Sequence, residues 1–164
     1  MDAVDGARFR TILGYFPTGV TIVAGDTDDG PEGLTIGSFT SVSLDPPLVG
    51  FLPMASSTSW RAIAASGKFC VNVLGTNHGE LCWRFARPSE RDRFTGVDWK
   101  PSPLGSPIID GAVAWIDCTI EETCPMGDHE FILGRVRHLD HGDHPGLDPL
   151  VFLRGRLGGF AAFD

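Results

Sequence analysis

The chain has 164 residues, of which 42% are hydrophobic and 21% charged, and its formal net charge is −8 at pH 7. That composition is typical of one soluble globular domain over residues 1–164, and it excludes a disordered chain, a collagen and a coiled coil. Because negative charge repels phosphates, we expect neither nucleic acid nor an anionic membrane as a partner. No apolar stretch approaches the ~18 residues of a membrane span.

The N-terminus and the four cysteines favour a reducing compartment. Residues 1–10 contain acids and no hydrophobic stretch like that of a secretory signal, so a cytoplasmic location is expected. Cys70, Cys82, Cys118 and Cys124 are widely spaced and form no C-x-x-C pair. We interpret them as reduced, mostly buried thiols rather than as zinc ligands or disulfide partners.

The first half of the chain is expected to mix short helices with strands. Residues 5–16 form an expected helix that Pro17 ends, and one face of it carries Phe9, Ile12, Leu13 and Phe16. A turn-forming run, DTDDGPEG, joins the first two strands into a hairpin. The strands expected in this half are 19–25, 34–43, 48–52 and 69–74, with further helices at 57–66 and 78–87.

The second half is expected to be mostly β after a proline-rich loop over 88–110. Residues 112–122 alternate with a period of two, which predicts a strand with Asp117 on its outer face. Trp115 shares that face and indicates either a subunit interface or an ordinary exposed aromatic. Strands at 129–139, 150–153 and 157–160 complete the chain.

Strands that do not alternate with helices argue against a doubly wound parallel sheet. A small antiparallel barrel, closed or nearly closed, fits best because closure removes exposed strand edges.

Several catalytic motifs are missing from the sequence. It contains no dinucleotide-binding glycine motif, P-loop, zinc-protease helix or nucleophile elbow. His138, His141 and His144 are spaced three residues apart, which fits either a metal site or, as we favour, a solvated loop.

Two hydroxyl-rich segments remain as candidate binding sites. Residues 34–43 place hydroxyls on both faces of the expected strand, and Gly37 removes a side chain in its middle, as happens where a ligand approaches closely. Residues 56–59 are four successive hydroxyl residues at an expected helix start, which suits either a phosphate or simple helix capping. Arg87, Arg91 and Arg93 are interpreted as a local source of positive charge or as a solvated run.

Five segments resemble the flavin reductase domain family, the small partners of two-component flavin-dependent monooxygenases. The most specific are the run S-F-x-S-V-S-L-x-P-P-L-V and a later G-D-H, and the similarity spans residues 9–156. The matching segments are 16–23 (FPTGVTIV), 33–51 (GLTIGSFTSVSLDPPLVGF), 67–74 (GKFCVNVL), 127–136 (GDHEFILGRV) and 149–155 (PLVFLRG).

The resemblance implies a mainly β fold, a six-stranded antiparallel Greek-key split barrel that binds FMN, with short flanking helices. It implies a homodimer that transfers hydride from NADH, or from NADPH, to FMN or FAD. The reduced flavin would then serve a partner monooxygenase.

The resemblance also implies roles for individual residues. His129 of the G-D-H would act at the nicotinamide, with Asp128 forming the turn or orienting His129. Residues of the S-F-x-S-V-S run would lie along the flavin, the hydroxyl cluster would lie by its phosphate, and Arg154 would lie close to the nucleotide. The implied flavin contacts are Thr35, Gly37, Ser38, Phe39, Ser41, Val42, Ser43, Ser57, Thr58, Ser59, Phe85 and Arg154.

Departures from the family pattern leave other readings open. Gly37, Leu153 and Leu157 stand where relatives often carry side chains that hydrogen-bond or stack, so contacts at these positions are in doubt. One alternative is a non-catalytic flavin- or haem-binding protein on the same barrel. Another is an enzyme like pyridoxamine phosphate oxidase, which needs basic residues for a substrate phosphate that the sequence does not locate.

Overall fold

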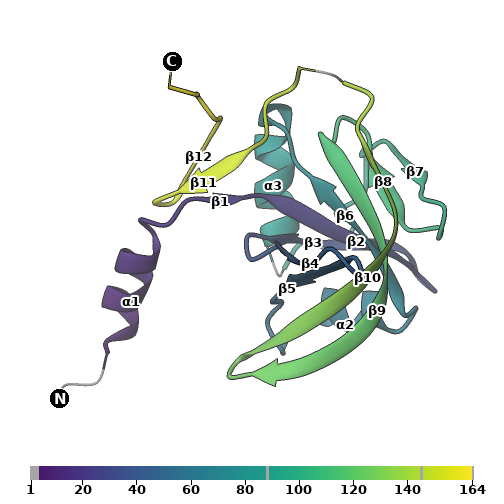
Figure 1. Ribbon diagram of the computed structural model, residues 1–164, viewed down its shortest axis with the longest axis horizontal. Helices are drawn as coiled ribbons and strands as arrows, with labels where there is room; N and C mark the ends of the chain where they lie inside the picture. Colours follow the sequence, from purple (N-terminus) through teal and green to yellow (C-terminus); the bar gives the residue numbers. More distant parts are fainter. Residues whose placement is uncertain (1–3, 88, 145, 164) are drawn as a thin grey trace.

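The computed structural model describes residues 4–87, 89–144 and 146–163, and it is dominated by antiparallel β-strands (Figure 1). The strands of the main sheet are β2 (Thr21–Thr27), β3 (Gly30–Ile36), β4 (Thr40–Ser43), β5 (Leu48–Phe51), β6 (Lys68–Val73), β9 (Ala114–Met126) and β10 (His129–His141). Their order is β3-β2-β6-β9-β10-β5-β4, so the expected six-stranded sheet has seven strands. The predicted mainly β class is confirmed.

Three helices and two small sheets accompany the main sheet in the described part of the chain. The helices are α1 (Gly6–Leu13), α2 (Thr58–Ala64) and α3 (Gly79–Ala86), with a 3₁₀ turn, η1 (Thr76–His78), before α3. One small sheet contains β1 (Thr18–Gly19), β11 (Val151–Leu153) and β12 (Arg156–Gly158). The other contains β7 (Trp99–Pro101) and β8 (Pro107–Ile109). The proline-rich region thus contains a short hairpin, β7–β8, which the sequence did not predict.

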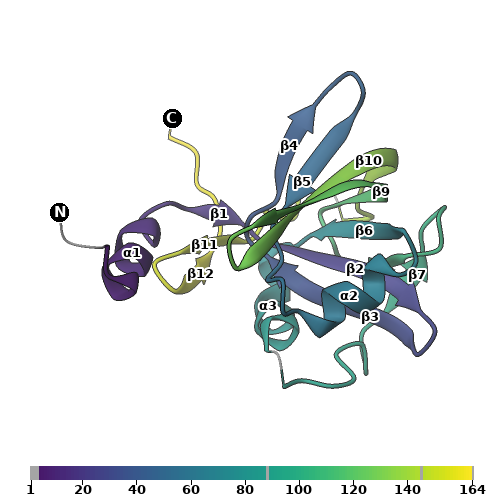
Figure 2. The same ribbon diagram turned by 90° about the horizontal axis from the view of Figure 1, so that it is seen from below.

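The strand expected over residues 34–43 is wrong as a single element. β3 and β4 lie at opposite edges of the seven-stranded sheet, and only Gly37, Ser38 and Phe39 separate them in the chain. The sheet therefore curls so that the end of β3 and the start of β4 come together, and from this crossover the two strands run apart (Figure 2). The Ser38 hydroxyl accepts a hydrogen bond from the Leu52 amide at 2.9 Å, which ties this crossover to the end of β5.

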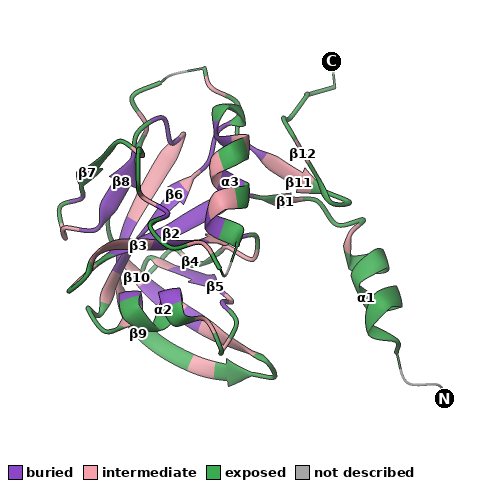
Figure 3. Ribbon diagram, turned by 180° about the vertical axis from the view of Figure 1, so that it is seen from behind, coloured by how far each residue is buried: buried purple, intermediate pink, exposed green. Residues whose placement is uncertain are grey.

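The core fills the inside of the curled sheet and the gap beneath the two helices that cover it (Figure 3). Phe51 and Trp60 meet edge to face with ring centroids 5.1 Å apart, and Phe69 packs against both. Trp60 therefore anchors α2 to the sheet, as a buried aromatic side chain is suited to do. A second cluster lies beneath α3 and includes the buried residues Cys82 and Phe85.

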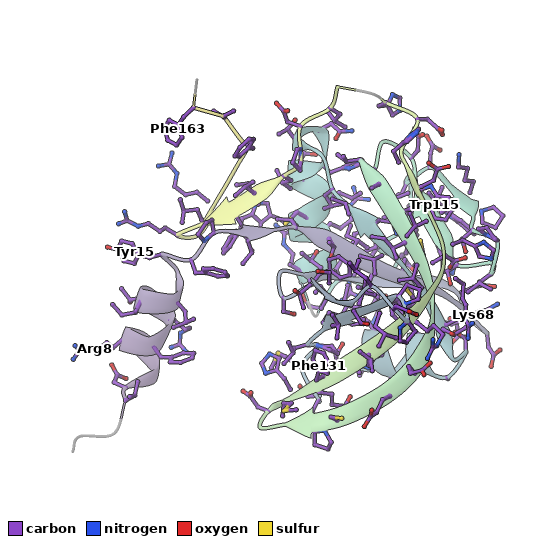
Figure 4. All side chains as sticks on the ribbon, in the orientation of Figure 1. Arg8, Tyr15, Lys68, Trp115, Phe131 and Phe163 are labelled. Atoms are coloured by element: carbon purple, nitrogen blue, oxygen red, sulfur yellow. The ribbon has the colours of Figure 1, made fainter. Side chains whose placement is uncertain are left out.

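A second region extends away from the barrel, and we call it the arm: α1, β1, β11, β12 and residues 159–163 (Figures 1 and 2). Asp5 caps α1, and the helix has the expected amphipathic spacing, but none of its residues is buried. Phe9 is 57% and Phe16 70% exposed. In Figure 4, Tyr15 and Phe163 lie on the arm, far from Lys68 and Trp115 on the barrel.

Asp117 was expected on the outer face of its strand, and that face is covered, so Asp117 is fully buried. The segment after β7 folds over it, and the Leu104 amide donates a 2.8 Å hydrogen bond to its Oδ2. Burial raises the pKa of the Asp117 carboxyl above its usual range, although the hydrogen bonds from Leu104 and Ser102 oppose that shift. Trp115 is half-buried and lines a cavity together with Trp99 of β7.

None of the helices in the described ranges is both long and apolar enough to cross a membrane. The four cysteines all lie in those ranges and carry free thiols, and Cys70, Cys82 and Cys118 are buried. His138 and His141 belong to β10, and among the residues that the structure places, no three histidine, cysteine or acidic side chains are grouped to hold a metal.

Candidate functional site

A groove of about 980 Å³ runs along β3, between α3, the residues after β5 and the arm, and we call it the apolar groove. Its walls are mostly hydrocarbon, with hydroxyl groups and one histidine among them. The side chains that line it are Phe9, Leu13, Leu34, Thr35, Ile36, Ser38, Leu52, Pro53, Met54, Ser56, Ser57, Thr58, Ser59, Phe85, Ala86, Arg93 and His129, together with Gly37. Most of the residues expected at the flavin and nicotinamide are therefore in one place.

Two of the predicted hydroxyls on this wall already have partners within the chain. Thr35 donates from its hydroxyl to the Cys82 carbonyl at 2.7 Å, which fastens β3 to α3. The Thr35 oxygen keeps its capacity to accept a hydrogen bond. The Ser38 hydroxyl is shared with the main chain of Leu52, as described above, so its first role is to hold the crossover in place.

The hydroxyl cluster lies beside a buried arginine. Ser57 is the N-cap of α2 and accepts a hydrogen bond from the Trp60 amide at 3.2 Å, so capping accounts for one of its interactions. Ser59 accepts from Arg93 Nη1 at 2.6 Å. Both hydroxyls therefore retain a proton that can be donated to a ligand. The exposed Thr58 lies between them on the groove wall.

Arg93 belongs to the run that the sequence left open between a charged site and a solvated loop, and it is buried. Its side chain is only 7% exposed and forms a 2.9 Å ion pair with Glu32. Its Nη2 donates to the Arg87 carbonyl at 2.8 Å, whereas its Nε is buried without a hydrogen-bond partner among the described residues. The guanidinium is thus fixed in position next to the Ser59 hydroxyl.

His129 begins β10 and lines the groove next to Met54, with which it forms a bridge between backbones. Its Nδ1 lies 2.7 Å from Asp128 Oδ1, and its side chain is 38% exposed. The hydrogen bond to His129 holds the pKa of the Asp128 carboxyl below its usual range. Because a carboxylate only accepts, Nδ1 carries a proton, and Nε2 is the nitrogen left for a ligand. This contact fits the expected orienting role of Asp128.

Five of the predicted contacts do not line the groove. Once the chain crosses at 37–39, β4 pairs with β5 at the far edge of the sheet, which carries Ser41, Val42 and Ser43 away from β3. Phe39 packs against the core instead. Arg154 lies in the arm, above the Tyr15 ring at 4.6 Å from its centroid.

The Arg154–Gly155 pair has a local structural explanation. The two residues form the tight turn between β11 and β12, and both have positive φ, 52° and 76°. A two-residue hairpin of this type requires that conformation, which glycine adopts without strain. Phe85 touches the groove but is 1% exposed and packs on Phe94 with centroids 5.0 Å apart, so it is chiefly a core residue.

Phe9, Leu13 and Met54 line the groove although no sequence motif marked them as site residues. The first two lie on the apolar face of α1, so the amphipathic spacing was the one available signal. Met54 is brought to the groove by its bridge to His129 across the sheet, which depends on strand register.

Residues 13–161 match the family described as "Flavin reductase like domain". The chain belongs to this family. It is 50% identical to a flavin reductase of Pseudomonas putida over 161 residues, 98% of this chain and 93% of that protein. It is 46% identical to the reductase subunit HsaB of a flavin-dependent monooxygenase from Mycobacterium tuberculosis strain H37Rv, covering 93% of this chain and 81% of that protein.

A crystal structure of nitrilotriacetate monooxygenase component B from Mycobacterium thermoresistibile has a TM-score of 0.91 against this chain. The two are 46% identical, and the match covers 94% of this chain and 86% of that one. The predictions of a split-barrel fold, of the family and of NAD(P)H-dependent flavin reduction are confirmed by these similarities.

The groove suits a flavin on its own physical grounds. An isoalloxazine ring has two apolar faces and a polar edge, so it needs hydrocarbon walls and a few hydrogen-bonding groups along one side. The groove supplies the walls from Leu13, Met54 and Ile36, and it supplies the polar groups from the β3 crossover. The fixed guanidinium and free hydroxyl protons at residues 57–59 suit the flavin phosphate.

Proposed function

We propose that the apolar groove binds the flavin substrate and that NADH reduces the flavin there. The observation that carries this proposal is the meeting in one groove of Thr35, Gly37 and Ser38 with residues 57–59 and His129, which lie in three distant parts of the sequence. In this arrangement the ring lies along β3, and the phosphate end lies at residues 57–59 and Arg93.

Flavin reduction requires placement more than side-chain chemistry. A reduced nicotinamide supplies hydride to the flavin when the two reacting atoms come within about 3–3.5 Å of each other. No general acid or base is needed for this direct transfer. The chain's own contribution is to stack the two rings, exclude water with Phe9, Leu13 and Met54, and donate hydrogen bonds to the edge of the ring that gains charge.

His129 is the proposed contact for the nicotinamide. It stands at the mouth of the groove, with Asp128 fixing the ring so that Nε2 is available. From that position it can hydrogen-bond the carboxamide of NADH or, when protonated, balance its negative charge. We propose NADH as the preferred donor.

The test is steady-state oxidation of NADH and NADPH at 340 nm with FMN, FAD and riboflavin. His129→Ala is expected to raise the KM for NADH about tenfold or more while changing the KM for flavin less than threefold. His141→Ala, which removes an exposed histidine from the other end of β10, is the matched control. Equal losses for both substrates would contradict the role of His129. A protein that binds flavin without turnover would instead support the non-catalytic alternative.

We also propose that the chain works as a homodimer through its arm. Phe9, Ile12, Leu13 and Phe16 are all more than half exposed in the single chain. An exposed apolar cluster of that kind marks a protein–protein contact. Because Phe9 and Leu13 also line the groove, a partner packed on the arm would complete the enclosure of the flavin.

The reduced flavin is proposed to leave for a separate oxygenase component, as the names of the monooxygenase subunits among the relatives suggest. Adding the cognate oxygenase and its substrate to the reductase, NADH and flavin is expected to yield hydroxylated product. Product that also forms across a dialysis membrane between the two proteins would show that the flavin travels freely, whereas product only on mixing would show a direct complex.

A further inference from the structure

A second groove adjoins the apolar groove, and we call it the polar groove. Its volume is about 830 Å³, and it lies between the β2–β3 turn, the start of α2 and residues 90–95. Thr58, Ser59 and Arg93 line both grooves, so the two are continuous at the point proposed above for the flavin phosphate. A ligand that extends past this phosphate would therefore enter the polar groove.

Arg93 is built into the junction between the grooves. Its buried guanidinium contacts Ser59, Glu32 and the Arg87 carbonyl, and its Nε, buried as well, has no hydrogen-bond partner in the described ranges. These contacts prevent the guanidinium from swinging out to solvent. The Ser59 oxygen accepts from Arg93, so its hydroxyl proton remains available to donate to a ligand. The junction thus presents fixed positive charge and hydroxyl donors to a phosphate group.

The polar groove has a different chemistry from the junction. Trp99 is 38% exposed and lies edge to face with Phe94, with ring centroids 6.2 Å apart, so an aromatic surface is available there. Any nucleobase can stack on such a surface, because every base has a flat aromatic face. The carboxylates of the groove can accept hydrogen bonds from ribose hydroxyls, as acidic residues do in nucleotide sites. These carboxylates are Asp29, Glu32, Glu90 and Asp92.

The charge of the polar groove favours an uncharged ligand end. Its four carboxylates outnumber the guanidinium groups of Arg91 and Arg93, so a further phosphate is disfavoured beyond the junction. An adenosine joined through a pyrophosphate fits this distribution of charge. The negative pyrophosphate would lie at the junction, and the neutral adenosine would lie in the polar groove. Both FAD and NADH contain such an adenosine.

The position of the polar groove indicates whether its adenosine would come from FAD or from NADH. Arg93 contacts Glu32 and Gly33 near the start of β3, whereas His129 lies with Met54 close to Ser38 and Leu52. Thr58, Ser59 and Arg93 line the polar groove, whereas Met54 and His129 line the apolar groove alone. The polar groove therefore opens from the phosphate end of the flavin and not from the nicotinamide end.

Resting on the proposed function, we propose that the polar groove is the adenosine subsite for FAD and that the chain reduces FAD in preference to FMN. Trp99 is then a specificity-determining residue of the flavin site. The residue acts on the part of FAD that does not react, so its effect appears in binding and not in turnover.

The first experiment compares KM values for FAD, FMN and riboflavin with NADH as donor. The KM for FAD is expected to be about tenfold lower than that for FMN, and Trp99→Leu is expected to remove most of that ratio. Trp83→Leu, at another partly exposed tryptophan on α3, is the control and should keep the ratio. Equal KM values for FAD and FMN in the unaltered protein would overturn the proposal.

Adenosine provides an independent probe that needs no variant. We expect adenosine to compete with FAD and to leave the reduction of riboflavin unaffected, because riboflavin occupies only the apolar groove. If adenosine instead competes with NADH in the riboflavin assay, or if Trp99→Leu raises the KM for NADH with FMN, the subsite belongs to NADH and the proposal is wrong. Failure of the proposed function itself would look different, since NADH would not be oxidised with any of the three flavins.

Discussion

Phe51 in the barrel and Phe163 in the arm carry the same side chain in opposite surroundings. Phe51 is fully buried against Trp60 and Phe69, whereas Phe163 is fully exposed. The same contrast holds for the helices, because α2 buries Trp60 and Ile63 while α1 buries nothing. The barrel is thus complete as a single chain, whereas within the arm Phe152 and Leu157 pack on the barrel but α1 leaves its apolar face exposed.

The largest expected effect of this contrast is on stability. Phe51→Ala should lower the free energy of unfolding by about 3–5 kcal/mol, because it removes a buried ring and leaves a cavity. Phe163→Ala should change it by about 0.5 kcal/mol or less, because the ring has no packing to lose. Urea denaturation at a fixed protein concentration measures both. Similar losses for the two variants would show that the arm is packed in solution.

The next largest effect concerns assembly. Ile12→Asp combined with Phe16→Asp should raise the dissociation constant of the proposed dimer at least about 100-fold, since two charges would enter an apolar contact. Sedimentation velocity across a range of concentrations gives the constant directly. Leu139→Asp, at a residue of β10 that is also well exposed, should leave the dimer intact. If the unaltered protein is a monomer, the proposal that a second subunit covers the apolar face of α1 is wrong.

A third prediction uses the buried Asp117. Its pKa is higher in the folded chain than in the unfolded one, so the folded state binds the proton more tightly. The free energy of unfolding should therefore fall as the pH rises from about 4 through the folded pKa, with a slope of at most about 1.4 kcal/mol per pH unit. Asp117→Asn should flatten this slope in denaturation curves recorded at several pH values. A slope that survives the substitution would assign it to another group.

The smallest expected effect comes from removing a helix N-cap, once in the barrel and once in the arm. Ser57→Ala removes the N-cap of α2 and should lower the free energy of unfolding by about 1 kcal/mol. Asp5→Ala removes the N-cap of α1, where the carboxylate accepts from the amides of Ala7 and Arg8. It should leave the unfolding of the barrel unchanged, because no residue of α1 is buried. Circular dichroism during denaturation compares the two variants.

The strands and helices of the barrel were largely predictable because short stretches of sequence specify them. Alternating residues over 112–122 and the cap at Ser57 specify β9 and the start of α2 without reference to the rest of the chain. The break at Gly37 was not predictable, since a run of β-prone residues on both sides reads as one strand. Only the closure of the sheet decides that Thr35 and Ser41 belong to opposite edges.

The site was predictable in part, and mainly through the family resemblance. Residues 57–59 were marked by their hydroxyls at an expected helix start and His129 by the G-D-H motif, and the structure places both along the groove. Arg93 could not be identified as a buried residue, because burial of an arginine depends on Glu32 and Ser59 from elements far away in the sequence. The burial of Asp117 on the outer face of β9 was not predictable for the same reason, since the covering segment around Leu104 is a long-range contact.

The crossover at residues 37–39 has a consequence for how this enzyme should be studied. No main-chain hydrogen bond connects these residues to another described part of the chain, so their amides and carbonyls stay outside the sheet ladder. Polarity at this point of the groove therefore comes from the peptide backbone, which every ordinary side-chain replacement preserves. Alanine substitutions would not remove these backbone amides and carbonyls. Replacing the amide by an ester at Ser38 or Phe39 would measure their contribution to flavin binding.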